Sequence, residues 1–280
     1  MPKKVQVTLT GNESKRLIAK AAVLHPEVRG RLDNGHKLLL AGGTTVSALA
    51  EELGFGPMRI SGRIDAEGTR SAQTITQTPH NLLIQNGQAV NADKNIQAIV
   101  EGLSSDDLIV TGANAIDPSG RAALAFAALG GGSRGYALHS AYMQGIPMLV
   151  LSGLNKLIPD LGVAMAYSGR SGVKYSMGAA IGLYNIFGPV VTEIKSFELL
   201  FNVQAVVIAG SGIGSGEGSR TFILIGEDEN IRQAWNAVLA LKGCTLSGEA
   251  DSLAVCYGGC DNCIRHVGCI YKGNDKNTVD

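Results

Sequence analysis

The 280-residue chain carries 24 basic and 24 acidic residues, so its formal net charge at pH 7 is zero. Its 45% hydrophobic residues, 5% aromatic residues and 37 glycines are typical of an ordinary α/β protein and exclude a disordered chain or a coiled coil. Because no basic stripe is visible that could displace counterions from a phosphate backbone, nucleic acid is excluded as a partner.

The N-terminal segment, Met-Pro-Lys-Lys-Val-Gln-Val, lacks the long apolar core of a signal peptide. No uninterrupted apolar stretch reaches the ~20 residues that a membrane span requires. We therefore expect a soluble cytoplasmic protein with no membrane partner. The neutral surface and the glycine-rich segments are compatible with a homodimer without requiring one.

The first half of the chain alternates helical and strand-like patterns. Apolar residues at helical spacing predict helices, and short apolar runs without alternation predict strands that are covered on both faces of a parallel sheet. The pair Asn86-Gly87 between two apolar runs predicts a hairpin, because both turn residues need positive φ. The predicted helices are 13–24, 46–53 and 96–103, and the predicted strands are 37–41, 81–85, 88–90 and 107–111.

The second half continues this alternation and then changes. Helices are predicted over 120–129 and 136–144, a strand over 146–151, and a close-packed helix or a loop over 169–188. Strands over 204–209 and 221–225 and a helix over 231–241 predict a small α+β unit. The predicted fold is α/β, with a doubly wound, mostly parallel sheet in residues 1–195, a smaller α+β domain in 196–250 and a Cys-rich tail in 251–280.

Glycine and threonine follow the predicted strand 37–41 as Gly42-Gly43-Thr44-Thr45. At a strand-to-helix junction, free backbone N–H groups and the positive end of the helix dipole favour an anion, and glycine lets a ligand approach the backbone. A threonine cap beside glycines is also common in any α/β turn. We favour anion binding over simple capping at this junction.

A second group of residues combines Gly112-Ala113-Asn114-Ala115-Ile116-Asp117 with the glycine run Gly130–Gly132 and with Lys156. In order and approximate spacing it resembles ribose-5-phosphate isomerase, in a superfamily with glucosamine-6-phosphate deaminase, CoA transferases and the effector domains of sugar-phosphate-responsive repressors. The resemblance covers residues ~37 to 160. It implies a phosphate-binding turn at Gly42–Thr45.

The resemblance departs from that family where the chemistry would be. The family has two acids after its Gly-Ala pair, whereas this chain has Asn114 and Ala115 and keeps only Asp117. It also supplies a Glu shortly after the glycine run, and here only His139 is titratable near neutral pH. A chain without that base is not expected to isomerise sugars by the family's route. A packed or surface role is the more common one for such a histidine.

The resemblance implies that Lys156 contacts a phosphate or hydroxyl and that the glycine run brings substrate hydroxyls to backbone amides. A solvated lysine and a tight helix junction explain the same residues equally well. The candidate catalytic residues are Asp117, Lys156 and His139, and the candidate ligand-binding residues are Gly42, Gly43, Thr44, Thr45, Gly112, Asn114, Gly131, Gly132 and Lys156.

The glycine-rich segment 210–219 resembles a dinucleotide-binding motif in composition. That motif must open a helix, because the pyrophosphate rests on the helix N-terminus. Here the segment leads into the strand-like run 220–225. We therefore predict a hairpin loop that could act as a flap over a neighbouring site, and no nucleotide cofactor.

Cys256, Cys260, Cys263 and Cys269 crowd the C-terminal segment, while Cys244 stands alone. In a chain without an export signal, thiols or a metal are favoured over disulfides. Four thiolates within 14 residues suffice for tetrahedral Zn²⁺ or a [4Fe–4S] cluster, with His266 as a fifth donor. A tail of free thiols is the alternative.

Three functions follow from these patterns. The first is binding of a phosphorylated small molecule, a sugar phosphate or a CoA ester, at the strand ends, with a divergent isomerase or transferase reaction if the chain is an enzyme. The second is a zinc or iron–sulfur protein, a sensor or electron carrier, in which the large domain is a scaffold. The third is an assembly subunit whose fold has lost its chemistry.

Overall fold

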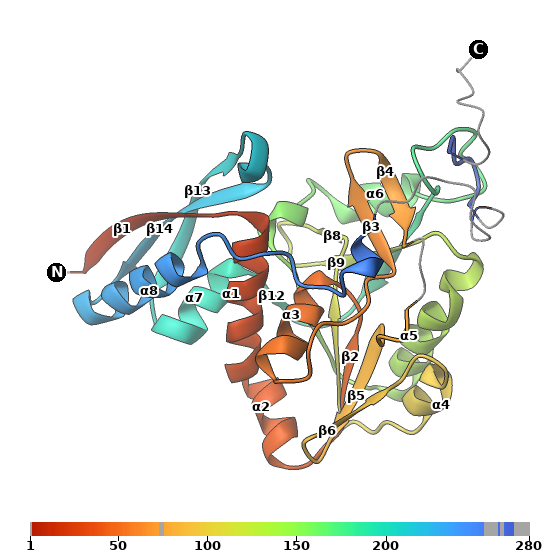
Figure 1. Cartoon of the computed structure of the whole chain (residues 1–280), viewed down its shortest axis with the longest axis horizontal. Coiled ribbons are helices and arrows are strands. Elements are labelled where there is room, and N and C mark those ends of the chain that lie inside the picture. Colours follow the sequence, from red (N-terminus) through yellow and green to blue (C-terminus); the bar gives the residue numbers. More distant parts are fainter. Residues whose placement is uncertain (1, 73–75, 255–262, 264–265, 272–280) are drawn as a thin grey trace.

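A computed structural model describes residues 2–72, 76–254, 263 and 266–271 (Figure 1). Its centre is a six-stranded mixed sheet in the order β12-β10-β7-β2-β5-β6. Four neighbouring strands, β12, β10, β7 and β2, run parallel, and the pairings of β2 with β5 and of β5 with β6 at the other edge are antiparallel. The strands are β2 (Leu38–Ala41), β5 (Asn81–Gln85), β6 (Gln88–Asn91), β7 (Leu108–Gly112), β10 (Met148–Leu151) and β12 (Val190–Val191).

Helices cover both faces of this sheet. On one face, α1 (Gly11–Leu24), α2 (Pro26–Asp33) and α3 (Thr44–Glu52) pack against the sheet in a fully buried apolar cluster. On the other face, α4 (Ile96–Glu101) and α5 (Gly132–Gln144) build a second cluster. Strand β2 is buried along its whole length because it lies between the two layers.

A three-stranded antiparallel sheet forms a smaller unit beside the large one (Figure 1). It joins the N-terminal strand β1 (Lys3–Leu9) to β14 (Ser219–Gly226) and β13 (Gln204–Ser211). Helices α7 (Glu193–Phe201) and α8 (Asp228–Leu241) cover one face through a core of their own. The small unit therefore contains a strand from the start of the chain, which a boundary near residue 195 does not anticipate.

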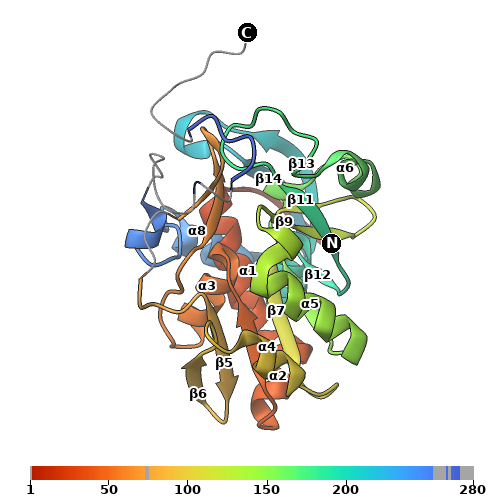
Figure 2. The same cartoon turned by 90° about the vertical axis from the view of Figure 1, so that its right-hand side faces the viewer.

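Short elements surround the ends of the parallel strands. One small sheet consists of β8 (Ala115–Ile116), β9 (Ala122–Phe126) and β11 (Gly182–Ile186), and one hairpin of β3 (Gly62–Asp65) and β4 (Gly68–Ser71). The others are α6 (Leu161–Tyr167) and the single turns η1 (Leu129–Gly131), η2 (Leu154–Lys156), η3 (Gly214–Gly216) and η4 (Asp251–Leu253). Figure 2 shows β9 and β11 near α6, with α5 facing the viewer.

Several predicted elements are confirmed. The strands at 37–41, 107–111 and 146–151 correspond to β2, β7 and β10. The Asn86-Gly87 pair turns β5 into β6 with φ of 50° and 73°. The segment 210–219 joins two antiparallel strands as predicted, because β13 pairs with β14.

Other predictions are wrong. The alanine-rich segment 120–129, predicted as a helix, contains β9, which pairs with β8 and β11. Partner strands on both sides override its helix propensity. Of the two alternatives for 169–188, a helix or a loop, the structure has a loop over 169–181, followed by β11, which was not predicted. Neither β1 nor α7 was predicted.

No helix among the described residues is long and apolar enough to cross a membrane.

Candidate functional site

Helix α3 starts directly after β2 without a side-chain cap. Its N-cap residue, Gly43, has φ of 125°, which a residue with a Cβ rarely adopts, and open space lies where its Cβ would be. Position 42 requires glycine for a different reason, because a Cβ there would lie 2.0 Å from the His80 ring. The first N–H groups of α3 are thus left for another acceptor.

Arg134 lies in the first turn of α5 and reaches across the ends of β2 and β7. Its Nη2 donates to the Ala41 carbonyl at 2.6 Å and to the Thr111 hydroxyl at 2.5 Å. Both terminal nitrogens also approach the Gly42 carbonyl, at 3.3 and 3.4 Å. Burial lowers the pKa of Arg134 to about 10, so its guanidinium stays charged at neutral pH.

The glycine run places Arg134. Gly130, Gly131 and Gly132 all have positive φ, between 63° and 73°, and Gly131 is the N-cap of α5. Three successive residues in this region favour glycine strongly. The run therefore determines where the first turn of α5, with Arg134, meets the sheet.

His80 is the neutral neighbour of this guanidinium. Its Nδ1 lies 2.8 Å from the Arg59 carbonyl, and its Nε2 lies 3.4 Å from Arg134 Nη1. Burial, followed by the charge of Arg134, lowers the pKa of His80 to about 4. The geometry fits the tautomer in which Nδ1 donates and Nε2 accepts.

Lys156 lies at the end of η2, after β10. Its Nζ donates to the Ala113 carbonyl at 2.5 Å, just beyond the end of β7. Burial, followed by the charge of Lys15 on α1, lowers the pKa of Lys156 to about 8. Burial lowers the pKa of Lys15 as well.

We call Lys15, Arg134 and Lys156 the basic cluster. All three side chains are partly buried, and among the residues that the structure describes none forms an ion pair with a carboxylate. Thr111, which anchors Arg134, is in β7, and Ala113, which anchors Lys156, follows the end of that strand. Both anchors therefore lie at the same end of β7.

Two buried hydroxyls lie at the same edge without partners. Thr45 is 2% exposed and follows β2, and Ser152 is fully buried and follows β10. Neither Oγ1 of Thr45 nor Oγ of Ser152 has a hydrogen-bond partner within the described part of the chain. Unpaired buried hydroxyls cost free energy, so both are candidates to bind a ligand.

Glu193 and Arg220 fix the turn that carries Lys156. The buried carboxylate of Glu193 accepts from the Leu154 N–H at 2.9 Å, and Arg220 Nη2 donates to the Leu154 carbonyl at 3.0 Å. Burial raises the pKa of Glu193. Both residues come from the small unit, so the two sheets cooperate in placing Lys156.

The predicted catalytic residues lie in different environments. Asp117 is 4% exposed and is held inside its own loop, because it accepts from the N–H groups of Ser119, Arg121 and Leu161 and pairs with Arg121 Nη2 at 2.6 Å. The Ser119 hydroxyl and the Arg121 guanidinium hold its pKa well below the usual range. His139 is exposed on α5.

Apart from Lys156, the predicted ligand-binding residues fall into three groups. Gly42, Gly43, Thr44 and Thr45 form the junction of β2 and α3, as expected. Gly112 ends β7, and the Asn114 side chain accepts from the Ala125 N–H at 3.0 Å, which attaches β9 to this edge. The glycine run acts through α5.

Sequence reasoning missed several residues at this edge. Lys15 belongs to the ordinary basic pair Lys15-Arg16, Arg134 follows the glycine run without being part of the predicted site, and His80 lies outside every motif. Three successive glycines, which permit positive φ, could have indicated that a helix begins there and that its first turn, with Arg134, is fixed against the sheet. No local signal pointed to Lys15, because α1 precedes the sheet in the chain.

Of the predicted metal ligands, Cys256 and Cys260 lie outside the described residues. Cys263 is buried and Cys269 partly buried. His266, 8% exposed, has its Nε2 3.0 Å from the Ser71 hydroxyl. Among the described residues, no three His, Cys, Asp or Glu side chains lie close enough to hold a metal ion.

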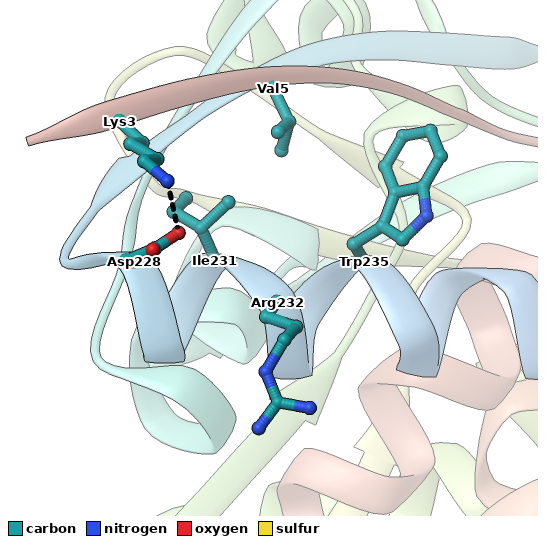
Figure 3. Close-up of a pocket in the computed structure, with 6 residues that line it drawn as sticks. All are labelled: Lys3, Val5, Asp228, Ile231, Arg232 and Trp235. Atoms are coloured by element: carbon teal, nitrogen blue, oxygen red, sulfur yellow. Dashed lines mark ion pairs between the residues drawn. The ribbon is translucent and has the colours of Figure 1, made fainter.

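A shallow depression of about 320 Å³ lies elsewhere, on the small unit between β1 and α8 (Figure 3). Its floor includes Val5, Ile231 and Trp235, and Lys3 and Asp228 pair across its end at 2.7 Å. It contains none of the residues described above.

Comparisons of the chain with protein-family models, with curated proteins and with solved structures find no match.

Proposed function

We propose that this protein binds a phosphorylated small molecule, a sugar phosphate or a CoA ester, at the carboxyl ends of β2, β7 and β10. The observation that carries the proposal is the basic cluster, three partly buried cations without a carboxylate partner among the described residues. Charges taken out of water are costly unless they are paired. A bound dianion would supply the missing negative charge.

The neighbouring groups suit the same ligand. The uncapped N-terminus of α3 offers backbone donors and a positive dipole end. The hydroxyls of Thr45 and Ser152 add two unpaired donors. In open α/β sheets, ligands bind beyond the carboxyl ends of the strands, which is where these groups lie.

The resemblance to the ribose-5-phosphate isomerase superfamily supports a phosphorylated ligand in particular. It also implies a doubly wound, mostly parallel sheet, which we include in the proposal. Any isomerase-like or transferase-like reaction here would need a base other than Asp117, which already accepts several hydrogen bonds. We therefore propose ligand binding as the main function and a divergent isomerase-like or transferase-like reaction only in addition to it.

A thermal-shift screen tests it with ribose 5-phosphate, glucosamine 6-phosphate, CoA esters and inorganic phosphate. A ligand at 100-fold its Kd adds about 2.7 kcal/mol to the free energy of unfolding, several degrees in Tm for this size. We expect a shift with a phosphorylated compound that is lost in Lys156→Met and kept in Lys20→Met, since Lys20 is an exposed residue paired with Glu52. No shift with any compound would refute the proposal.

We also infer that the four C-terminal cysteines bind a metal ion or an iron–sulfur cluster. Cys263 and Cys269 flank a segment that is attached to the body of the protein, because the Ser176 N–H donates to the Gly268 carbonyl at 2.7 Å and the Ile270 N–H donates back to Ser176 at 3.0 Å. Anaerobic preparation followed by metal analysis should give one zinc, or four irons, per chain. Cys263→Ser should lose the metal and Cys244→Ser should keep it.

A further inference from the structure

The two anchored cations of the basic cluster differ in chemistry. Arg134 gives several of its donors to carbonyls and to a hydroxyl, and its guanidinium keeps its charge. Among the described residues, Lys156 has one side-chain hydrogen bond, to the Ala113 carbonyl, and burial, followed by the charge of a second cation, Lys15, lowers its pKa. Arg134 therefore supplies a fixed positive charge, and Lys156 can act as an amine.

We propose that Lys156 is a nucleophile that forms an imine with the carbonyl carbon of a phosphorylated aldehyde or ketone. The proposal rests on the binding function above, because the phosphate would be held by Arg134 and the α3 N-terminus while the carbonyl end reaches Lys156. The anchors of the two side chains, Thr111 near the end of β7 and Ala113 just beyond it, lie at the same strand end, where the two ends of one short ligand would be held.

The surroundings of Lys156 favour its neutral form. The side chain is partly buried, Lys15 repels its proton, and no carboxylate among the described residues offsets that repulsion. A desolvated lysine beside another cation is the arrangement that activates amine nucleophiles. The lowered pKa of Lys156, about 8, leaves a sizeable neutral fraction near neutral pH.

The position of the amine is also fixed. The η2 turn is held from both sides of Leu154, by the Glu193 carboxylate and by the Arg220 guanidinium. When neutral, Nζ can keep its N–H bond to the Ala113 carbonyl while its lone pair points elsewhere. Ordering a reactive amine in this way lowers the entropy cost of attack.

The reaction balances without an oxidant or reductant. The Nζ lone pair forms a bond to the carbonyl carbon, the π electrons move to oxygen, and one amine proton ends on that oxygen as a carbinolamine. The hydroxyl then leaves with a second proton as water while the C=N bond forms. Amine and carbonyl thus give imine and water.

Reductive trapping tests the proposal on the full chain. Ribose 5-phosphate and, in parallel, ribose are incubated with the protein and sodium cyanoborohydride, and modified lysines are located by peptide mass mapping. We expect ribose 5-phosphate to modify Lys156 at least tenfold faster than Lys20, with ribose much slower. Lys156→Arg should remove the adduct. Lys15→Met should slow adduct formation at Lys156 several-fold. Lys15→Arg, which keeps the positive charge, should leave this rate close to that of the unmodified chain.

Calorimetric binding of ribose 5-phosphate separates the possible failures. Binding without an adduct at Lys156 overturns the imine and leaves the binding function intact. If ribose forms the adduct at Lys156 as fast as ribose 5-phosphate does, Lys156 is a nucleophile, but the proposed phosphate site is refuted. An adduct distributed over exposed lysines such as Lys20 overturns the imine, and neither binding nor adduct overturns both. Mapping of the unmodified chain does not depend on any variant folding.

Discussion

Two groups of charged side chains lie in loops at the ends of the parallel strands, and they are satisfied to very different degrees. Asp117 is paired with Arg121 and accepts three backbone N–H groups. Lys156, after β10, has one carbonyl as its partner and a like charge nearby. Asp117, the acid that the sequence predicts as catalytic, therefore stabilises its own loop. The charge without an opposite partner among the described residues is that of Lys156.

The first prediction uses acid to break the arrangement around Arg134. The pKa of His80 in the folded protein, about 4, lies below its ordinary 6.5, so the folded state binds fewer protons between these values. This contribution to stability is present above pH 6.5 and is lost as the pH falls towards 4, by about 3 kcal/mol. Urea unfolding of the protein and of His80→Asn across this range measures it. Identical pH profiles would contradict the assignment.

The second prediction removes the unbalanced charge. Lys156→Met should weaken binding of the phosphorylated ligand about 10–100-fold, because a charged hydrogen bond contributes about 1.5–3 kcal/mol. The free energy of unfolding without ligand should change by less than about 1 kcal/mol, since no ion pair is lost. Calorimetry and urea unfolding give the two numbers. Equal loss of stability and affinity would mean that Lys156 is structural.

The third prediction reverses this pattern at Asp117. Asp117→Asn removes the pair with Arg121 and the carboxylate that three N–H groups share, so Tm should fall by several degrees. Ligand affinity, measured below the new Tm, should stay within about twofold. A large loss of affinity with an unchanged Tm would return Asp117 to the candidate catalytic residues.

The fourth prediction, the smallest, concerns the unpaired hydroxyls. Thr45→Val and Ser152→Ala should each weaken binding about 2–10-fold, the contribution of a neutral hydrogen bond, and should leave the free protein as stable as before. Ser47→Ala is the matched control, because the Ser47 hydroxyl already bonds the Met58 N–H and Ser247. It should lower stability and leave affinity unchanged.

The sequence was sufficient for features that depend on local pattern. Short apolar runs identified β2, β7 and β10, and the junction Gly42–Thr45 was placed at a strand end. It was insufficient where partners distant in the chain decide. Pairing across more than two hundred residues places β1 beside β14, and neighbouring strands make β9 a strand despite its alanines.

The same limit applies to the site. Lys15 meets Lys156 only because α1 packs beside the end of β10, and Arg134 meets Thr111 only because the glycine run directs α5 across the sheet. These cations lack carboxylate partners because of where folding buries them, and the sequence composition contains no information about burial. Asp117, by contrast, could be identified from the sequence alone because it belongs to one short motif.

A crystal structure of the protein with ribose 5-phosphate would test the central claim most directly. We predict a phosphate at the N-terminus of α3, within hydrogen-bond distance of Gly43, Thr45 or Arg134, and the sugar directed towards Lys156. Phosphate bound only outside the basic cluster, for instance beside Lys3 and Arg232 at the depression in Figure 3, would contradict it.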